Sequence, residues 1–372
     1  MKTPPRPEFD LLLLSTRWPR DEGDAERICG LLRRDVDWDR LLGIARRHGL
    51  VPMLYRMLAP LASSGIPIDV LAKLRFQAEA YRLRNLVLVS ESLNALRALE
   101  AAGIIAMPYK GPALAAFLYG DFFLRQSADI DLLVRPCDAV RARHVLLGLG
   151  YVPNRAISER MEPLFVRLNC EFAFTIKKQV VVELNWRVSQ WFWRLPEIPP
   201  AAWDRAGRLS LAGTSVPWFS AEDLLIVLCL HGSKHKWDSL KWIVDIAQLL
   251  RNHPDLDWRE ITDYARKTGA ERMLALGLFL ANDLLGAPLP SGSSSAIQIK
   301  PSVVSLAEEV YENLLAARSE PAGLMQTLPF LARIADRLDT RLVCRMLPVG
   351  YFLVLRILRP GMAAVRRANA GG

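Results

Sequence analysis

Three acidic residues are spaced so that they could meet at one place. Asp129 and Asp131 lie one residue apart in the apolar stretch 129–134, and Glu183 lies in a second apolar stretch, 180–184. In a β-strand, residues i and i+2 point to the same face, so the first two carboxylates would converge. Neighbouring carboxylates repel one another unless a cation lies between them. The acids are therefore candidate ligands for divalent metal ions.

Upstream of the acid pair, the residue types suit a phosphate group. Lys110 and Gly111 fall between a short apolar segment and a helix that Pro112 is expected to open. Free backbone N–H groups at a helix start favour phosphate oxygens, although proline lacks one such donor. Arg125 adds a guanidinium that could bind phosphate through two hydrogen bonds. Three acids and a phosphate-binding turn predict a two-metal phosphoryl-transfer site with Mg²⁺, or Mn²⁺ as the alternative.

A second group of basic residues lies further along the chain. His231 and His235 are four residues apart, a spacing at which two histidines on a helix can share a metal ion. No third ligand stands nearby in the sequence, and Gly232-Ser233 is expected to end the helix. We therefore interpret Lys234, His235 and Lys241 as a basic wall that faces phosphate or acceptor. In the competing interpretation, His231 is a core histidine and the lysines are solvated.

The elements that must position these residues are predicted from periodicity and from helix-ending signals. Helical spacing covers much of 22–100, including a helix that Gly49 is expected to end and a long helix over Ile68–Ala101 that Gly103 ends. Strands are predicted at 103–107, 129–134, 170–176 and 180–184, the last two joined by a turn at 177–179. Helices are predicted at 113–118 and after Asp138, which is expected to cap the second of them. Beyond Ser220, which has capping-box spacing to Asp223, helices are predicted at 241–251, 270–286, 303–317, 323–338 and 341–358.

This order of elements predicts an α+β fold. We expect an N-terminal helical region at 1–100, a core with a small mixed β-sheet at 101–215, and a C-terminal helical region with a basic tail at 216–372. The 51% of hydrophobic and 23% of charged residues favour a packed core and argue against long disorder. The five cysteines include no CxxC pair, which predicts neither a zinc site nor a disulfide framework.

The two ends of the chain bear on its location. The N-terminus lacks the long uncharged apolar segment of a signal peptide, and no stretch is long enough to span a bilayer, so we expect a cytoplasmic protein. Six arginines and no acid follow from Arg341 onward, within a net charge of +9. Such a tail could contact an anionic membrane surface weakly, but we favour a terminal helix packed on the body. No nucleic-acid-binding motif is present, so nucleic acid is not an expected partner.

The order of the motifs resembles a known family. Lys110-Gly111, Asp129-Ile130-Asp131 and Glu183 resemble the nucleotidyltransferases of the DNA polymerase β-like superfamily. The chain is more narrowly similar to a largely uncharacterised bacterial branch, whose pattern includes Arg125, Asp129–Val134, Glu183–Trp186, His231, Lys234, His235, Trp237 and Asp245. The resemblance covers about 100–250 closely. It implies a nucleotidyltransferase core that moves a nucleoside monophosphate from a nucleoside triphosphate to an acceptor hydroxyl, with release of pyrophosphate.

The chain departs from this pattern in three ways, one of which is that the gap from the Lys110-Gly111 turn to Asp129 is longer than in minimal members of the superfamily. Lys110-Gly111-Pro112 replaces the usual Gly-Gly or Gly-Ser turn, and Asn185 stands where the branch often has His. The acceptor, whether small molecule, peptide or protein, is not encoded in any motif. One alternative is a non-catalytic relative that binds a nucleotide or a partner in the same pocket. Another is a DxD glycosyltransferase, which would need a βαβ half before the acid pair, where this chain is helical.

Overall fold

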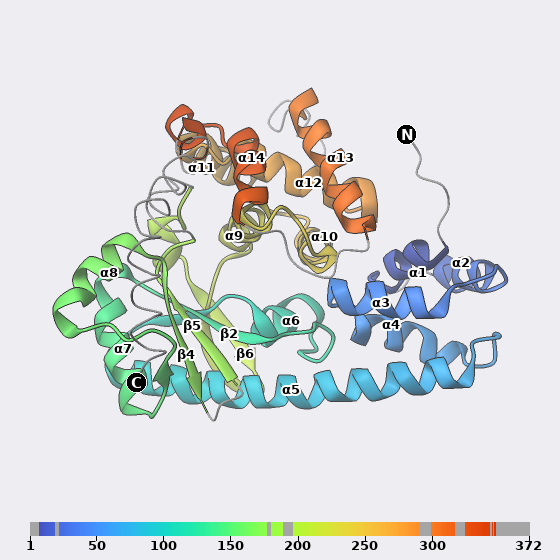
Figure 1. Ribbon diagram of the computed structural model, residues 1–372, viewed down its shortest axis with the longest axis horizontal. Coiled ribbons are helices and arrows are strands. Elements are labelled where there is room, and N and C mark those ends of the chain that lie inside the picture. Colours follow the sequence, from blue (N-terminus) through green and yellow to red (C-terminus); the bar gives the residue numbers. More distant parts are fainter. Residues whose placement is uncertain are drawn as a thin grey trace, which may run out of the picture.

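The computed structural model describes residues 7–18, 22–176, 180–188, 196–289, 299–316, 324–342, 344 and 346. It is an α+β structure in which a small sheet lies between two groups of helices (Figure 1). The predicted turn at 177–179, almost all of the predicted helix 341–358 and most of the arginine-rich tail lie outside the described residues.

The N-terminal part is helical, as predicted. Its elements are α1 (Pro7–Ser15), α2 (Glu22–Leu32), α3 (Trp38–His48), α4 (Val51–Leu58), the short 3₁₀ helix η1 (Ala59–Leu61) and α5 (Ile68–Ala101). Helix α3 begins where the Asp37 side chain accepts the Arg40 N–H, and it ends at Gly49, whose φ is 71°. The 34-residue α5 runs along the sheet and the smaller N-terminal helices (Figure 1).

The sheet has the strand order β1-β2-β5-β4-β3. Its strands are β1 (Ala106–Pro108), β2 (Asp129–Val134), β3 (Val152–Pro153), β4 (Glu171–Ile176) and β5 (Val180–Asn185). Strands β2 and β5 are parallel, and their register places Asp131 beside Glu183. The other neighbouring pairs are antiparallel. Because paired residues share a face, the register alone brings the third acid to the first two.

The two faces of the sheet differ in character. Ile130, Leu132, Val182 and Phe174 alternate with the acids and are buried in the core. Helix α5 contacts β1 and β2, and α7 (Ala139–Gly148) contacts β5. The strands therefore bury one face and direct the acids to the other.

Further elements connect and cover the sheet. They are α6 (Gly111–Tyr119), η2 (Pro136–Asp138), η3 (Glu159–Met161), α8 (Glu162–Leu168), η5 (Pro200–Trp203) and the hairpin β6 (Gly207–Leu211)–β7 (Thr214–Trp218). The C-terminal helices are α9 (Ala221–Lys234), α10 (Leu240–Asn252), α11 (Trp258–Thr268), α12 (Glu271–Leu285), α13 (Pro301–Leu315) and α14 (Leu324–Ile334). Helices α9, α10 and α12 pack against one another, above the sheet in Figure 1.

Several predicted details were wrong. The first strand begins at Ala106 and not at Gly103, because the residues directly after α5 still cap that helix, with the Ile104 N–H bonded to the Leu99 oxygen at 2.9 Å. Asp138 does not cap α7, since its carboxylate pairs with Arg141 at 2.9 Å. The predicted cap at Ser220 is confirmed, because its side chain accepts the Asp223 N–H.

Some elements were not predicted at all: β3, α8, the β6–β7 hairpin and α11. The hairpin turns at Ala212 and Gly213, which both have positive φ (48° and 80°). Alanine rarely adopts that conformation, so the sequence carries a weak turn signal there. Helix α11 did carry signals, an N-cap at Asp257 and a left-handed C-cap at Gly269.

Candidate active site

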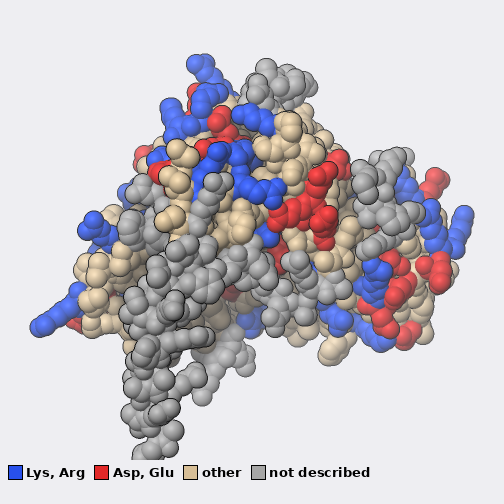
Figure 2. All heavy atoms as spheres, turned by 45° about the horizontal axis from the view of Figure 1, so that its top comes forward, with Lys and Arg blue, Asp and Glu red and all other residues tan. Residues whose placement is uncertain are grey.

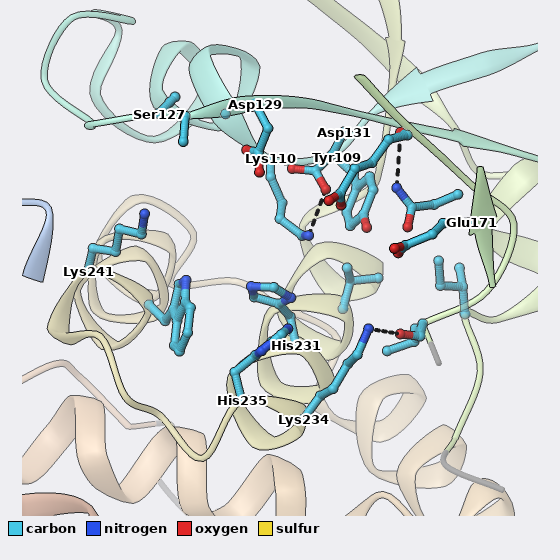
Figure 3. A pocket seen from close by; sticks show the side chains of 18 of the residues that line it. Tyr109, Lys110, Ser127, Asp129, Asp131, Glu171, His231, Lys234, His235 and Lys241 are labelled. Atoms are coloured by element: carbon cyan, nitrogen blue, oxygen red, sulfur yellow. Dashed lines mark hydrogen bonds and ion pairs between the residues drawn. The ribbon is translucent and has the colours of Figure 1, made fainter. Parts of the chain in front are cut away.

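One pocket brings the predicted functional residues together, and Figure 3 shows that its walls differ. Its volume is about 320 Å³. Its lining includes every predicted site residue: Lys110, Gly111, Arg125, Asp129, Asp131, Glu183, Lys234, His235 and Lys241. Asp129, Asp131 and Glu171 lie on the sheet side, opposite His231, Lys234, His235 and Lys241 on the helical side (Figure 3). We call Asp129, Asp131, Glu171 and Glu183 the acidic wall, and His231, Lys234, His235 and Lys241 the basic wall.

The acidic wall is electrostatically crowded. Burial, with the charges of Asp131 and Glu171, raises the pKa of Glu183 to about 8. Burial and the Asp131 charge also raise the pKa of Asp129, against the opposing effect of Lys110 and Lys241. Asp131 is itself buried. Carboxylates whose charged forms are this costly favour a cation between them.

Lys110 already supplies one positive charge to this wall. Its Nζ lies 2.9 Å from Asp131 Oδ1, and both side chains are largely buried (Figure 3). The amine also lies 4.6 Å from the centroid of the Tyr109 ring. Burial alone would lower the pKa of Lys110, but the adjacent Asp131 carboxylate outweighs it and raises that pKa. Lys110 is therefore charged, and it neutralises part of the acidic wall.

The turn after Lys110 is shaped by glycine. Gly111 begins α6 with φ of 60°, and a Cβ there would lie 3.3 Å from the Asp129 backbone oxygen. Both the backbone conformation and the close approach to β2 favour glycine at this position. Pro112 follows within the first turn of α6, where its missing N–H removes no intrahelical bond. The start of α6 thus faces the acid pair.

Arg125 has a partner that the sequence did not reveal. Its Nε lies 3.0 Å from both carboxylate oxygens of Asp245 on α10, and its Nη2 lies 3.0 Å from Oδ2. The two side chains are 5% and 1% exposed. Buried Asn85 of α5 donates to the backbone oxygens of Phe122 and Arg125 and so fixes this loop. Arg125 joins the loop before β2 to the helical side of the pocket.

The basic wall comes from α9 and α10. Helix α9 runs through Lys234, so Gly232-Ser233 does not end it as predicted. The rings of His231 and His235 are 4.7 Å apart, and Trp242 lies 5.1 Å from the first and 5.5 Å from the second. Burial and the nearby Lys110 lower the pKa of His231, so its ring is neutral. Lys234 Nζ donates to the Val188 backbone oxygen at 2.9 Å.

The oxygen atoms of the acidic wall are of the type that binds divalent cations, but they are not arranged closely enough to coordinate one. Hard carboxylate oxygens from two adjacent strands face one pocket, and such oxygens are what Mg²⁺ prefers. Within the described residues, no group of three or more His, Cys, Asp or Glu side chains is gathered so that it could hold a metal ion. A bound cation would therefore have to draw Asp129 and Glu183 toward Asp131 and compete with Lys110.

Glu171 and Tyr109 also line the pocket, and neither was predicted to belong to the site. Glu171 pairs with Asn185 across β4 and β5, on the face that also carries Glu183. The sequence carried a signal for this position, because two predicted strands, 170–176 and 180–184, separated by only three residues indicate an antiparallel pair. Tyr109 directly precedes Lys110, and its N–H bonds to the Asp131 oxygen at 3.3 Å.

The outer surface carries both signs of charge. On the face drawn in Figure 2, Lys and Arg atoms and Asp and Glu atoms lie in neighbouring clusters. In the part of the chain that the structure describes, no helix is both long and apolar enough to cross a bilayer. Of the tail arginines, Arg341 is described, and its Nε donates to the Ala335 backbone oxygen at 2.8 Å.

A mixed sheet that presents paired acids to a basic helical wall is an arrangement suited to phosphoryl transfer. Comparison with known families agrees. The chain belongs to the family described as "Uncharacterised nucleotidyltransferase", whose model matches residues 34–286. No curated protein sequence matches the chain.

Two solved structures show a distant likeness. The solution structure of the antibiotic-resistance factor ANT(2'')-Ia has 15% sequence identity and a TM-score of 0.30, over 55% of this chain and 91% of that chain. The crystal structure of an antigenic nucleotidyltransferase-like protein from Paracoccidioides brasiliensis has 18% identity and a TM-score of 0.31, over 57% and 97%. At these TM-scores, neither structure bears on the substrate of this chain.

Proposed function

We propose that this protein is a Mg²⁺-dependent nucleotidyltransferase that transfers a nucleoside monophosphate from a nucleoside triphosphate to an acceptor hydroxyl. One observation carries the proposal: Asp131 and Glu183 are in register on adjacent strands and, with Asp129, face the basic wall across one pocket. Acids directed at a metal and bases directed at phosphates are the two requirements of this chemistry.

Asp129, Asp131 and Glu183 would hold Mg²⁺, with Mn²⁺ as a substitute. When bound, the metal would screen the charge of the triphosphate and favour the deprotonated acceptor. Binding of this cation would relieve the repulsion that raises the pKa values of Asp129 and Glu183. The acidic wall would then become fully ionised.

The other residues would bind and orient the donor. Lys110 and the Gly111 N–H lie where they could meet phosphate oxygens, and Lys234, His235 and Lys241 face them from the opposite wall. Because the Arg125 guanidinium is engaged by Asp245, we assign it to positioning the loop before β2, not to direct contact with phosphate. Charge-assisted hydrogen bonds of this kind are the strong ones in a pocket.

The reaction is an in-line displacement at the α-phosphorus. The acceptor oxygen forms a bond to this atom while the bond to the bridging α–β oxygen breaks, and pyrophosphate leaves with that electron pair. The acceptor proton passes to a carboxylate of the acidic wall. Holding both reactants in one pocket supplies the orientation that the displacement needs.

A calorimetric titration tests the proposal. ATP, GTP, CTP and UTP are titrated with and without Mg²⁺ into wild type, the Asp129→Asn/Asp131→Asn variant and an Asp138→Asn control. Asp138 pairs with Arg141 and does not line the pocket. We expect metal-dependent binding of at least one triphosphate, lost in the double variant and kept in the control. Absence of binding under every condition would overturn the proposal.

One observation favours a second candidate, a relative that binds a nucleotide without turnover. Lys110 already forms an ion pair with Asp131. A nucleotide could therefore bind beside the Lys110 ammonium group, which would take the place of a metal ion. The same titration separates the two candidates. Binding that does not depend on Mg²⁺ and is lost in a Lys110→Met variant supports the non-catalytic relative.

A further inference from the structure

The side chain of Lys241 packs against the end of α3, a helix of the N-terminal region. Gly49 ends α3 in the left-handed conformation, and a Cβ at this position would lie 2.9 Å from Lys241 Cδ and 3.6 Å from its Nζ. The lysine stem therefore rests on the Gly49 backbone. Glycine is favoured here both by its φ of 71° and by the absence of space for a side chain.

The residue before Gly49 fastens this turn to the start of α10. His48 is fully buried, and its Nδ1 accepts the Leu240 N–H at 3.3 Å. Its Nε2 lies 3.1 Å from the Leu314 oxygen. A ring that accepts at Nδ1 must donate from Nε2, so it is neutral, in keeping with the burial that lowers its pKa to about 4. Ser239 Oγ donates to the His48 oxygen at 3.1 Å.

Arg47 extends the same junction. Its Nη2 lies 3.3 Å from Asp238 Oδ1 and donates to the Asn313 oxygen at 2.9 Å. The turn after α3 is thus held on the residues just before α10 and on the end of α13. The partners in these contacts are more than 190 positions apart in the sequence. The end of α3 is therefore fixed to the C-terminal helices and not only to its own neighbours.

Lys241 contacts this junction through its stem and lines the pocket. It is the second residue of α10, directly after Leu240, and it makes no hydrogen bond or ion pair with any described residue. Arg125, Asp245, Asp129 and Asp131 are the charged groups around it. A long, unpaired side chain keeps many rotamers unless packing confines it. Contact with Gly49 supplies that confinement.

We propose that the His48–Gly49 turn positions Lys241 for the triphosphate, which makes the N-terminal helical region part of the nucleotide site. The inference rests on the proposed function, in which Lys241 faces the phosphates. His48 and Gly49 are positioning residues, since they act through Lys241. Disturbing the turn should weaken nucleotide binding only as long as Lys241 is present.

A Gly49→Ala variant tests this with a matched control. Gly120 also has a left-handed backbone, φ 66°, but a Cβ there meets no atom within 4 Å. Gly120→Ala therefore reproduces the backbone strain without touching Lys241. With the Mg²⁺-triphosphate that binds wild type, we expect Gly49→Ala to raise Kd about tenfold or more, because one charge-assisted phosphate contact is misplaced. Gly120→Ala should leave Kd unchanged.

A double-mutant cycle separates positioning from a general structural effect. If Gly49 acts through Lys241, Gly49→Ala should add no further loss of affinity in a Lys241→Met background. Additive losses would overturn the inference. If Gly49→Ala does not fold, Ser239→Ala replaces it, since this removes one hydrogen bond of the same junction. Its smaller effect on Kd should likewise vanish in the Lys241→Met background.

A second readout does not depend on nucleotide. Lys241 is acetylated with acetic anhydride, and its rate is measured by peptide mass spectrometry relative to exposed Lys267 in the same molecule. Gly49→Ala should increase this ratio several-fold, and Gly120→Ala should not. An unchanged ratio overturns the positioning role. An increased ratio in a protein that binds no triphosphate keeps the positioning role and overturns the proposed function.

Discussion

The acidic wall and the basic wall of the pocket are built by different means. Asp129, Asp131 and Glu183 are placed by strand alternation and by the register of two neighbouring strands. Lys241 is placed by helix packing, through contacts with Gly49 and with the junction at His48. The direction of each acid is therefore set by alternation within its own strand, whereas the confinement of Lys241 depends on residues far away in the sequence. Changes in the two walls should have different consequences.

The largest expected effect lies in the acidic wall. Asp131→Asn should reduce pyrophosphate release by on the order of 10³-fold or more, because it removes a metal ligand while the fold keeps an isosteric side chain. The assay supplies the triphosphate that binds wild type, Mg²⁺ and a fractionated metabolite extract as acceptor source. Asp138→Asn is the control, with full activity expected. Pyrophosphate release by Asp131→Asn at the wild-type rate would show that the acid is not needed.

The next effect tests the connection between the walls. Arg125→Met should lower the free energy of unfolding by about 3–5 kcal/mol, because it leaves the Asp245 carboxylate buried and unpaired. Adding Asp245→Leu should recover most of this loss, since an apolar pair needs no partner charge. Urea denaturation measures both.

A comparison pair on the surface calibrates that result. Arg141 and Asp138 form an exposed pair at 2.9 Å, and Arg141→Met should cost less than about 1 kcal/mol. Equal losses in Arg125→Met and Arg141→Met would mean that burial adds nothing to the Arg125–Asp245 pair.

This contrast also explains what the sequence could reveal. Period-two alternation placed Asp129 and Asp131 on one face, and the strands at 129–134 and 180–184 were predicted almost at their true bounds. The α+β class followed from the order of such elements. The roles of these acids in metal and nucleotide binding stay predictions.

Other features could not be predicted because they depend on tertiary contacts. Arg125 has the residue type of a phosphate ligand, and nothing in its neighbourhood of the sequence indicates Asp245, 120 positions away. The same holds for the contact of Gly49 with Lys241. Glycine at a helix end was predicted correctly, but its second role requires knowledge of what packs on it.

A smaller effect is expected in α9, the helix that carries His231 and Lys234 of the basic wall. Gly232 lies inside α9, where a Cβ would approach the Trp237 ring to 2.4 Å. Gly232→Ala should lower the free energy of unfolding by about 1–3 kcal/mol through overpacking. Gly43 lies inside α3 with no atom within 4 Å of its added Cβ. Gly43→Ala should instead stabilise by about 0.5–1 kcal/mol. Both variants are measured by chemical denaturation. A change in the free energy of unfolding that has the same sign in both would contradict this packing.

The last comparison distinguishes the two walls by the pH dependence of stability. The pKa of Glu183 is raised to about 8, so the folded protein without metal holds a proton that the unfolded chain has lost. This stabilisation is complete below about pH 4.5 and is lost as pH rises to about 8. The pKa of Lys241 is lowered to about 8, chiefly by burial, so stability is regained from about pH 8 to 10.5. Each slope is at most about 1.4 kcal/mol per pH unit.

The metal-free protein should therefore be least stable near pH 8, in a series of urea titrations from pH 5 to 10. Glu183→Gln should flatten the acidic limb and leave the alkaline limb, whereas Lys241→Met should do the reverse. Because Mg²⁺ competes with the proton on Glu183, its effect on Tm should be larger at pH 8 than at pH 6. A stabilisation by Mg²⁺ that is equal at both pH values and survives in Glu183→Gln would place the metal away from this carboxylate. The acidic wall would then be balanced by Lys110 and the basic wall alone, as the non-catalytic alternative requires.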